Sequence, residues 1–331
     1  MSYKSEDLSI SLGSLVVVTG ANGFIASHIC DQLLALGYHV RGTVRNTNRA
    51  GWMLPFFEAR YGTGKFSLVE VPDMAASGAY DKAVIGASGL CHVATPVMQS
   101  YNPHEGIPVV VNGTLNALEA AAKAPSVKRV VLTSSSTAAA SPQPNKAFLI
   151  DSNTWNEMAV EAAWAPPPYE GDQRRLDVYS ASKTQGEQAG GILPNANMGK
   201  ILSIEHQGYP STAGWIKALW NGFEGQEDLK FNPPQYYVNV DNARVHVAAL
   251  IFEDVQGERL FSFAHPYSWN DILAIFRKLY PQRKFLEDIP GLGEDKSVVA
   301  NERAEELLKR LGRSGWTSLE ESIKNITETL V

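Results

Sequence analysis

The chain has 331 residues, of which 44% are hydrophobic and 19% charged, and this is the composition of a globular protein with a packed core, not of a disordered or fibrous one. The 35 Asp and Glu outnumber the 29 Lys and Arg, which gives a formal net charge of −6. No broad basic character therefore favours nucleic acid or anionic lipid as a partner.

Short apolar runs alternate with helical patterns through the first half of the chain. Strands are expected at 14–19, 39–44, 66–71, 90–94 and 129–133, and helices at 24–36 and 109–124. Strands that alternate with helices are typical of βαβ units. The sequence therefore predicts an α/β protein with a doubly wound parallel sheet, a Rossmann fold.

The second half of the chain predicts a smaller lobe. After Ser136 the pattern loosens into a long loop that includes the run WAPPPY at 164–169, because consecutive prolines exclude regular helix. Helices are expected at 269–279 and from Leu319 onward, where Ser318 and Glu321 have capping-box spacing. We expect residues 1–195 to form mainly a nucleotide-binding domain and 196–331 mainly a substrate lobe, with 236–264 returning to the first domain.

A glycine turn connects the first expected strand to the first helix. Gly20, Gly23 and Ala26 lie in TGANGFIA, where small residues let backbone amides and a helix N-terminus approach a pyrophosphate. The bland alternative is a tight turn without a ligand. The position between a strand and a helix favours a dinucleotide site.

The next strand indicates which dinucleotide. An acidic residue about 20 positions beyond the glycines would bind the 2′-hydroxyl of NAD, but residues 38–46 contain none. Arg41 and Arg45 stand there instead and suit a 2′-phosphate. We therefore expect NADPH, with at least one of the two arginines lying in solvent, because alternate strand residues share a face.

A serine, a tyrosine and a lysine form the candidate catalytic group. Ser134 and Ser135 follow the strand at 129–133, and Tyr179 and Lys183 lie four apart in YSASK on an expected helix. A neighbouring ammonium would lower the phenol pKa from roughly 10 and make the tyrosine a proton donor. A serine hydroxyl would hold the same carbonyl oxygen.

The chain resembles the extended short-chain dehydrogenase/reductases, and within them the fungal NADPH-dependent aldehyde (carbonyl) reductases, which are relatives of plant dihydroflavonol reductases. The segments that carry the resemblance are TGANGFIASH, VRGTVR, NGTLNAL, VKRVVLTSS, YSASK, LPNANMGKIL, PPQYYV and ILAIFRKLYP. They are distributed over nearly the whole length. The resemblance implies a Rossmann fold, NADPH as cofactor and a small-molecule carbonyl substrate.

The resemblance also assigns roles to residues. It implies Ser135 as the catalytic serine, with Ser134 as a rival, Tyr179 as the proton donor, and Lys183 as the residue that binds the nicotinamide ribose and tunes the tyrosine. Asp73 would lie near adenine, and Pro194 and Asn195 beside the nicotinamide. The cofactor contacts implied are Gly20, Asn22, Gly23, Phe24, Ile25, Arg41, Arg45, Asp73, Met74, Ala94, Tyr179, Lys183, Pro194 and Asn195.

One interval departs from the family. Lys183 and Pro194 are 11 positions apart, with TQGEQAGGIL between them. This is roughly 14 residues short, because a helix end, a return loop and a core strand need more chain. We expect one central strand region to be shortened. This would leave backbone groups of its neighbours unpaired, unless the flanking sequence rearranges.

For several other residues we favour a structural role over a functional one. We expect His92 to make a local hydrogen bond at a strand end, and His246 to be packed in a helix capped by Asp241. Cys30 and Cys91 are too few for a disulfide framework and are expected to be inert core thiols without a metal. The remaining candidates are aromatic, and most of them are expected in the core with a few at a pocket: Trp215, Trp220, Phe223, Tyr236 and Tyr237.

The sequence thus predicts an oxidoreductase that reduces an aldehyde or ketone to an alcohol with NADPH. One alternative is an NAD-dependent sugar-nucleotide epimerase or dehydratase, and another is a nucleotide-binding homologue impaired by the short interval. The N-terminal stretch 1–12 lacks the apolar run of a signal peptide, and no long apolar segment occurs. We expect a cytoplasmic protein without membrane association, and the oligomeric state is left open.

Overall fold

A computed structural model describes residues 7–96, 100–187 and 191–331. Its central feature is a five-stranded parallel sheet with the order β3-β2-β1-β4-β5. The strands are β1 (Leu15–Thr19), β2 (His39–Val44), β3 (Phe66–Glu70), β4 (Gly89–His92) and β5 (Arg129–Leu132). The order reverses between β1 and β4, and ligands of such sheets bind outside the carboxyl ends of the strands at this point. The predicted doubly wound sheet is confirmed.

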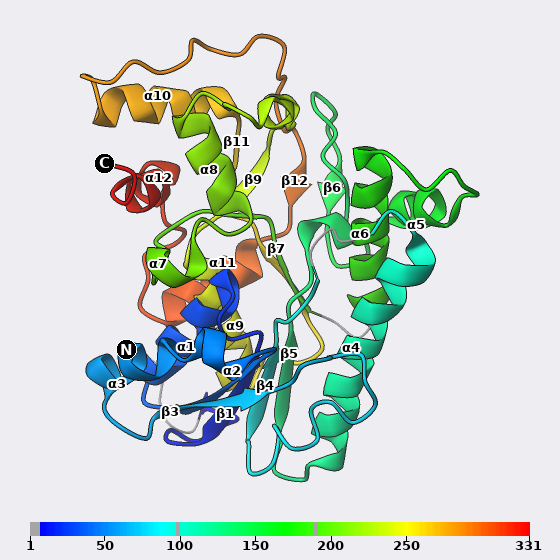
Figure 1. The fold of residues 1–331 in the computed structure, drawn as a ribbon, viewed down its shortest axis with the longest axis vertical. Helices are drawn as coiled ribbons and strands as arrows, with labels where there is room; N and C mark the ends of the chain where they lie inside the picture. Colours follow the sequence, from blue (N-terminus) through cyan, green and yellow to red (C-terminus); the bar gives the residue numbers. More distant parts are fainter. Residues whose placement is uncertain (1–6, 97–99, 188–190) are drawn as a thin grey trace.

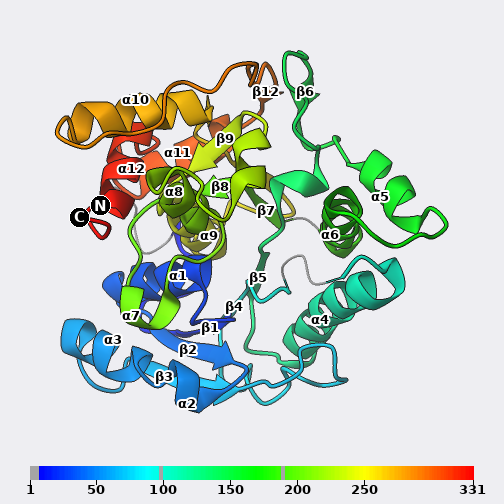
Figure 2. The same ribbon diagram turned by 45° about the horizontal axis from the view of Figure 1, so that its top comes forward.

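Helices cover both faces of this sheet (Figures 1 and 2). On one face, α1 (Phe24–Ala35) packs against α9 (Asp241–Ile251), which in turn contacts α11 (Glu302–Arg310). On the other face, α4 (Pro103–Lys123) and α5 (Glu157–Trp164) flank α6 (Asp172–Glu187). The contact between these three helices is an apolar cluster that includes Ile107, Ala163 and Val178. The short helices α2 (Thr47–Ala50) and α3 (Met53–Tyr61) follow β2.

A separate pair of strands extends the sheet beyond β5. β7 (Gly191–Pro194) and β10 (Arg259–Ser262) pair in parallel along their whole length. β7 meets the five-stranded sheet through one isolated bridge, between Thr133 and Ile192. The short interval of the sequence therefore contains one further turn of α6, residues 188–190 that lie outside the description, and a four-residue strand. A strand does occupy this place, although the described residues join it to the five-stranded sheet only at Thr133, directly after β5.

The remaining elements form a second layer at the carboxyl end of the sheet. β8 (Ala196–Asn197), β9 (Gln235–Val238) and β11 (His265–Tyr267) make a small mixed sheet, and an apolar cluster around Ile216 and Phe276 joins it to the helices of this lobe. These helices are α7 (Ile204–Gln207), α8 (Thr212–Trp220), η3 (Glu227–Phe231), α10 (Trp269–Leu279) and α12 (Leu319–Thr327). β6 (Leu149–Ile150) pairs with β12 (Val298–Val299), and η2 (Ser136–Ala138) follows β5.

Three local expectations need correction. The helix expected from residue 109 starts at Pro103, because the Asn102 side chain accepts from the backbone amide of His104 and so caps it, and Pro108 is accommodated inside the helix. The loop expected after Ser136 contains α5, capped by Asn156. Asp241 is not the cap of α9: Val240 holds that position, and the Asp241 carboxylate instead accepts from the Thr317 amide.

The two C-terminal helices begin where the sequence places them. α10 has a full capping box, in which Ser268 and Asp271 bond reciprocally. α12 begins after Ser318, whose hydroxyl accepts from the amide of Glu321 at 3.2 Å. Among the described residues, no helix combines the length and apolarity needed to cross a bilayer.

Candidate active site

The glycine turn lies at the switch point of the sheet. Gly20 has φ 65°, and a Cβ there would come within 3.1 Å of the backbone of Ala94, two residues beyond β4. A Cβ on Gly23 would meet the Gly20 carbonyl at 3.1 Å. Gly23 is also the N-cap residue of α1, which has no side-chain cap and no acidic residue in its first turn. The backbone thus leaves a helix N-terminus open to an anion, as a pyrophosphate site requires.

A glutamine from the second layer contacts this turn. The Gln207 amide nitrogen, at the end of α7, donates to the Asn22 carbonyl at 3.2 Å and to the Ser27 hydroxyl at 3.0 Å. Gln207 lies 185 positions from Asn22 in the sequence. It follows that no local pattern could have predicted this contact.

The two arginines of the β2 region lie in different environments. Arg41 donates from Nη1 to the carbonyls of Ala83 and Ile85, both at 2.8 Å. Arg45 is exposed just beyond the end of β2, and the described part of the chain gives its side chain no hydrogen bond or ion pair. Of these two arginines, Arg45 is therefore the one whose donors are available at the sheet edge.

Sequence reasoning missed two residues at the same edge. Arg49 is exposed on α2, four residues beyond Arg45, and a further cation so soon after the strand was a usable signal. Glu70 reaches the edge from β3, where its carboxylate accepts from the amide and the hydroxyl of Thr47 at 2.9 and 3.0 Å. These bonds hold the pKa of Glu70 below its usual value.

The residues after β3 form a turn against α4. The Asp73 carboxylate accepts from the amide of Ala75 at 2.8 Å. Met74 packs so closely on α4 that a Cβ on Gly113 would lie 2.0 Å from its methyl carbon. Asn116 holds the Met74 carbonyl at 2.9 Å. The turn is thereby fixed beside β3, at the same end of the sheet as Arg45.

The serine, tyrosine and lysine come together at the end of β5. Ser135 follows that strand, and its hydroxyl lies beside the phenol of Tyr179 on α6. One turn further along the helix, Lys183 donates from Nζ to the carbonyl of Thr133 at 3.1 Å. The spacing of four residues has thus placed the phenol and the ammonium on one helix face, next to the strand end.

The two serines are separated by their partners. Ser134 donates to the carboxylate of Glu187, one turn beyond Lys183, whereas Ser135 faces Tyr179 and Thr137. Side chains of neighbouring residues in extended backbone point to opposite sides. This geometry favours Ser135 over Ser134 for contact with a carbonyl oxygen.

The expected lowering of the tyrosine pKa is not what this geometry gives. Burial raises the pKa of Tyr179 above its ordinary value, and the neighbouring Ser135 hydroxyl opposes the rise. Burial also lowers the pKa of Lys183 to about 8, against the field of Glu187, which raises it. The ammonium bonds the Thr133 carbonyl and not the phenol. The phenol is therefore the stable form of Tyr179 near neutral pH.

Neighbouring strand ends complete the surroundings. Pro194 ends β7 and is buried, and the Asn195 side chain accepts from the amide of Ala196 at 2.7 Å. His92 bonds the Thr19 hydroxyl through Nδ1 at 3.1 Å, so the expected local hydrogen bond of His92 is confirmed. Burial lowers the pKa of His92 to about 3.

His246 is fully buried on α9, as the packed-residue expectation requires. Its Nδ1 lies 2.7 Å from the Asn242 carbonyl and therefore carries the proton, so the Thr133 hydroxyl donates to Nε2 at 2.8 Å. Thr133 is thereby held at both ends, since its carbonyl receives Lys183.

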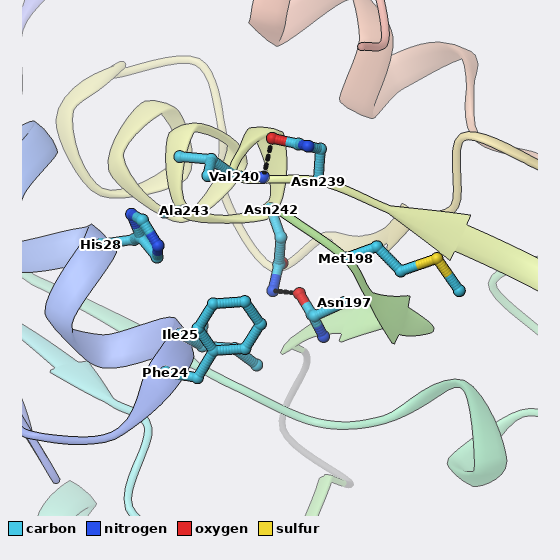
Figure 3. A pocket seen from close by; sticks show the side chains of 9 residues that line it. All are labelled: Phe24, Ile25, His28, Asn197, Met198, Asn239, Val240, Asn242 and Ala243. Carbon is cyan, nitrogen blue, oxygen red and sulfur yellow. Dashed lines mark hydrogen bonds between the residues drawn. The ribbon is translucent and has the colours of Figure 1, made fainter. Parts of the chain in front are cut away.

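A small cavity lies behind the glycine turn, between α1 and α9 (Figure 3). His28 donates to the Lys200 carbonyl at 2.6 Å, and the Asn242 amide donates to Asn197 at 2.9 Å. The side chains of Phe24 and Ile25 also line it. Its volume of about 10 Å³ leaves room for about one water molecule. The half-buried side chains of Phe24 and Ile25 thus line this cavity, while their backbone amides lie at the open N-terminus of α1.

The second-lobe aromatics and the cysteines are mostly core residues. Trp220, Phe223 and Tyr237 are each at most 5% exposed, and Tyr236 donates to the Ser297 carbonyl at 2.9 Å. Trp215 is partly buried against Trp269. Burial raises the pKa values of both free cysteines, Cys30 and Cys91. Within the described ranges, no group of three or more His, Cys, Asp and Glu side chains could hold a metal.

Comparison with known proteins gives consistent matches. Residues 16–160 match the model of the NAD dependent epimerase/dehydratase family. The chain is 42% identical to aldehyde reductase 2 of Sporidiobolus salmonicolor, with 98% of each chain covered. It is 38% identical to ketoreductase adrE of Penicillium rubens, with 94% of this chain and 95% of the relative covered.

Solved structures show the same fold. Gre2 of Candida albicans, solved in complex with NADPH, superposes with a TM-score of 0.78 at 25% identity, covering 96% of this chain and 98% of the other. Vestitone reductase from alfalfa superposes with a TM-score of 0.72 at 20% identity, covering 95% and 97%. Both likenesses extend over the two lobes.

Proposed function

This chain belongs to the NAD dependent epimerase/dehydratase family, and we propose that it is an NADPH-dependent reductase that converts an aldehyde or ketone into an alcohol. The observation that carries the proposal is that Ser135, Tyr179 and Lys183 come together at the carboxyl edge of the sheet, where the glycine turn also lies. Relatives named aldehyde reductase and ketoreductase support the carbonyl substrate class.

The residues present fit the cofactor. The uncapped N-terminus of α1 and the Gly20 and Gly23 cradle suit a pyrophosphate, and Arg45 with Arg49 suits a 2′-phosphate. Lys183 uses one of three ammonium donors on Thr133, which leaves others for ribose hydroxyls. The dinucleotide would supply hydride. The complex of the Candida albicans relative with NADPH agrees with this choice.

The side chains of this chain would handle the proton. Ser135 would hold the substrate oxygen by a hydrogen bond and stabilise the charge that develops on it. Tyr179, kept as a phenol by burial, would give its proton to the same oxygen from Oη. Lys183 would stabilise the phenolate that remains. The raised pKa of Tyr179 suits the reducing direction, in which the protonated form is the reactant.

The proposal includes the domain division and the place of action. Residues 1–195 would bind the cofactor and residues 196–331 would shape the carbonyl pocket, with 236–264 returning to the first domain. The two free, buried cysteines are compatible with the reducing cytoplasm.

The test is a titration of the purified chain with NADPH and NADH, followed by tryptophan fluorescence and thermal shift, and then by turnover on a panel of aldehydes and ketones. We expect saturable stabilisation by NADPH and carbonyl-dependent NADPH oxidation. Binding without turnover over the whole panel would contradict a reductase and favour an impaired homologue. NAD that remains bound through purification would favour an epimerase or dehydratase.

A further inference from the structure

A buried ion pair lies directly beneath the candidate catalytic group. The Arg259 Nε of β10 donates to Glu187 of α6 at 2.7 Å, and the two side chains are 6% and 0% exposed. Arg259 is fixed further by the carbonyls of Ser152 and Thr154, at 3.0 and 2.8 Å. Its guanidinium also lies 3.8 Å from the centre of the Trp155 ring.

The pair reaches the site through Glu187. This carboxylate accepts from Arg259 with one oxygen and from Ser134 with the other. Ser134 directly precedes Ser135 in the chain, and Glu187 follows Lys183 by four residues, which places both on one helix face. The carboxylate is therefore held between the strand end and the helix that together carry the catalytic group.

Stability alone is a poor explanation for this arrangement. Removing two charges from water costs more than most buried pairs regain, and well-packed apolar residues of similar volume are often at least as stable. An ionic pair buried next to a lysine is better explained by what its field does to that lysine.

We infer that Glu187 is a positioning residue of the proposed reduction, and that its buried carboxylate, oriented by Arg259 and Ser134, keeps Lys183 protonated and aligned beside Tyr179. The inference rests on the proposed function. The Lys183 pKa, about 8, supports it, since burial lowers this pKa and the Glu187 carboxylate raises it.

The other titratable groups around Lys183 do not supply a second negative charge. His92 on β4 and His246 on α9 have pKa values lowered by burial, to about 3 and about 4, and are neutral at neutral pH. Arg259 is a cation and would oppose the ammonium. The described contacts of α4 and α5 with α6 include an apolar cluster, with Val178 and Ala181 on the α6 side. Glu187 is thus the anion that Lys183 senses within the described residues.

The test uses a double variant, Glu187→Gln with Arg259→Met, because Glu187→Gln alone would leave Arg259 buried and unpaired. The matched control is Glu258→Gln with Arg303→Met, which removes another Glu–Arg pair, joined at 3.0 Å. Arg303 is on α11, and Glu258 directly precedes β10. A third variant, Arg259→Lys, keeps the buried positive charge, so its Lys183 titration midpoint should lie closer to that of the wild type than that of the double variant does.

The main readout is the pKa of Lys183, measured by 13Cε NMR on lysine-labelled protein without cofactor, with the signal assigned through Lys183→Arg. We expect the titration midpoint to fall by about one pH unit in the double variant and to stay at the wild-type value in the control. The basic limb of the kcat profile should move in the same direction, while KM for the carbonyl changes little. Thermal melting shows that each variant is folded.

The outcomes distinguish failure of the Glu187 inference from failure of the proposed reductase function. If the midpoint and the pH profile stay at the wild-type values while only melting changes, Glu187 is structural and the inference is overturned. If the midpoint shifts but the wild-type chain neither binds NADPH nor reduces carbonyls, the proposed function fails while the effect of Glu187 on Lys183 stands. A shifted midpoint in the double variant, together with NADPH-dependent carbonyl reduction by the wild-type chain, supports both.

Discussion

Replacing Arg45 with glutamine removes a cation from the edge of the sheet where a 2′-phosphate would bind. Arg45 is exposed, and the described residues give its side chain no partner. Arg41→Gln is the matched variant on the same strand, where the guanidinium instead bonds the Ala83 and Ile85 carbonyls. The pair of variants therefore compares two arginines that the sequence alone could not separate.

The magnitudes follow from these partners. A charge-assisted hydrogen bond to phosphate contributes about 1.5 to 3 kcal/mol, so Arg45→Gln should raise the Kd for NADPH about 10- to 150-fold and leave the Kd for NADH nearly unchanged. The two carbonyl bonds of Arg41 are only partly buried or exposed, so Arg41→Gln should lose about 1 to 2 kcal/mol of stability in all. This amounts to a fall in Tm of a few degrees, with a much smaller change in the ratio of the two Kd values.

The assay is a fluorescence titration of each variant with NADPH and NADH, beside a thermal melt without cofactor. If Arg41→Gln abolishes the preference for NADPH while Arg45→Gln keeps it, the assignment of the 2′-phosphate to Arg45 is refuted. If neither variant changes the preference, the two-arginine explanation for NADPH fails altogether.

Three further results are expected. Tyr179→Phe should lower kcat by about 10²- to 10⁴-fold with NADPH binding retained, and turnover near the wild-type rate would remove Tyr179 as proton donor. Ser135→Ala should lower kcat by about 10²-fold or more. Ser134→Ala should lower kcat much less and lower the melting temperature more. If kinetics and melts rank the two variants the other way round, Ser134 and not Ser135 is the catalytic serine. The pKa values of His92 and His246 are lowered to about 3 and about 4, so the unfolded chain binds more protons below about pH 6.5. Denaturant unfolding should therefore show stability that is lost as pH falls from there, by about 1 kcal/mol per pH unit for each histidine, and a flat profile between pH 6.5 and 5 would contradict these shifts.

Periodicity and motif position were sufficient for much of the fold and for the candidate site. β2 and α10 have the predicted bounds because an apolar strand followed by a turn, and a serine-capped amphipathic helix, are local signals. Tyr179 and Lys183 were predictable together because one helical turn fixes their relation. These features depend on residues close together in the chain.

Contacts between distant segments could not be predicted in this way. The Gln207 contact with the glycine turn, the carbonyls that bind Arg41, and the ion pair of Glu187 with Arg259 all join residues more than 40 positions apart. The predicted direction of the Tyr179 pKa shift was wrong for the same reason. It depends on burial by the whole fold, which outweighs the effect expected from the helix neighbour.

Among the described residues, the isolated bridge between Thr133 and Ile192 is what pairs the β7–β10 ladder with the five-stranded sheet. The β7–β10 ladder is held to the rest chiefly by α9, which packs on β4, β5, β7 and β10. Native-state amide exchange should then resolve two cooperative openings, with the β7–β10 amides exchanging before those of β1. Ala94 follows β4 on one side of this junction and Pro194 ends β7 on the other. If both contact NADPH as proposed, the cofactor should protect the β7–β10 ladder most, because it would connect two parts of the sheet that share few backbone bonds.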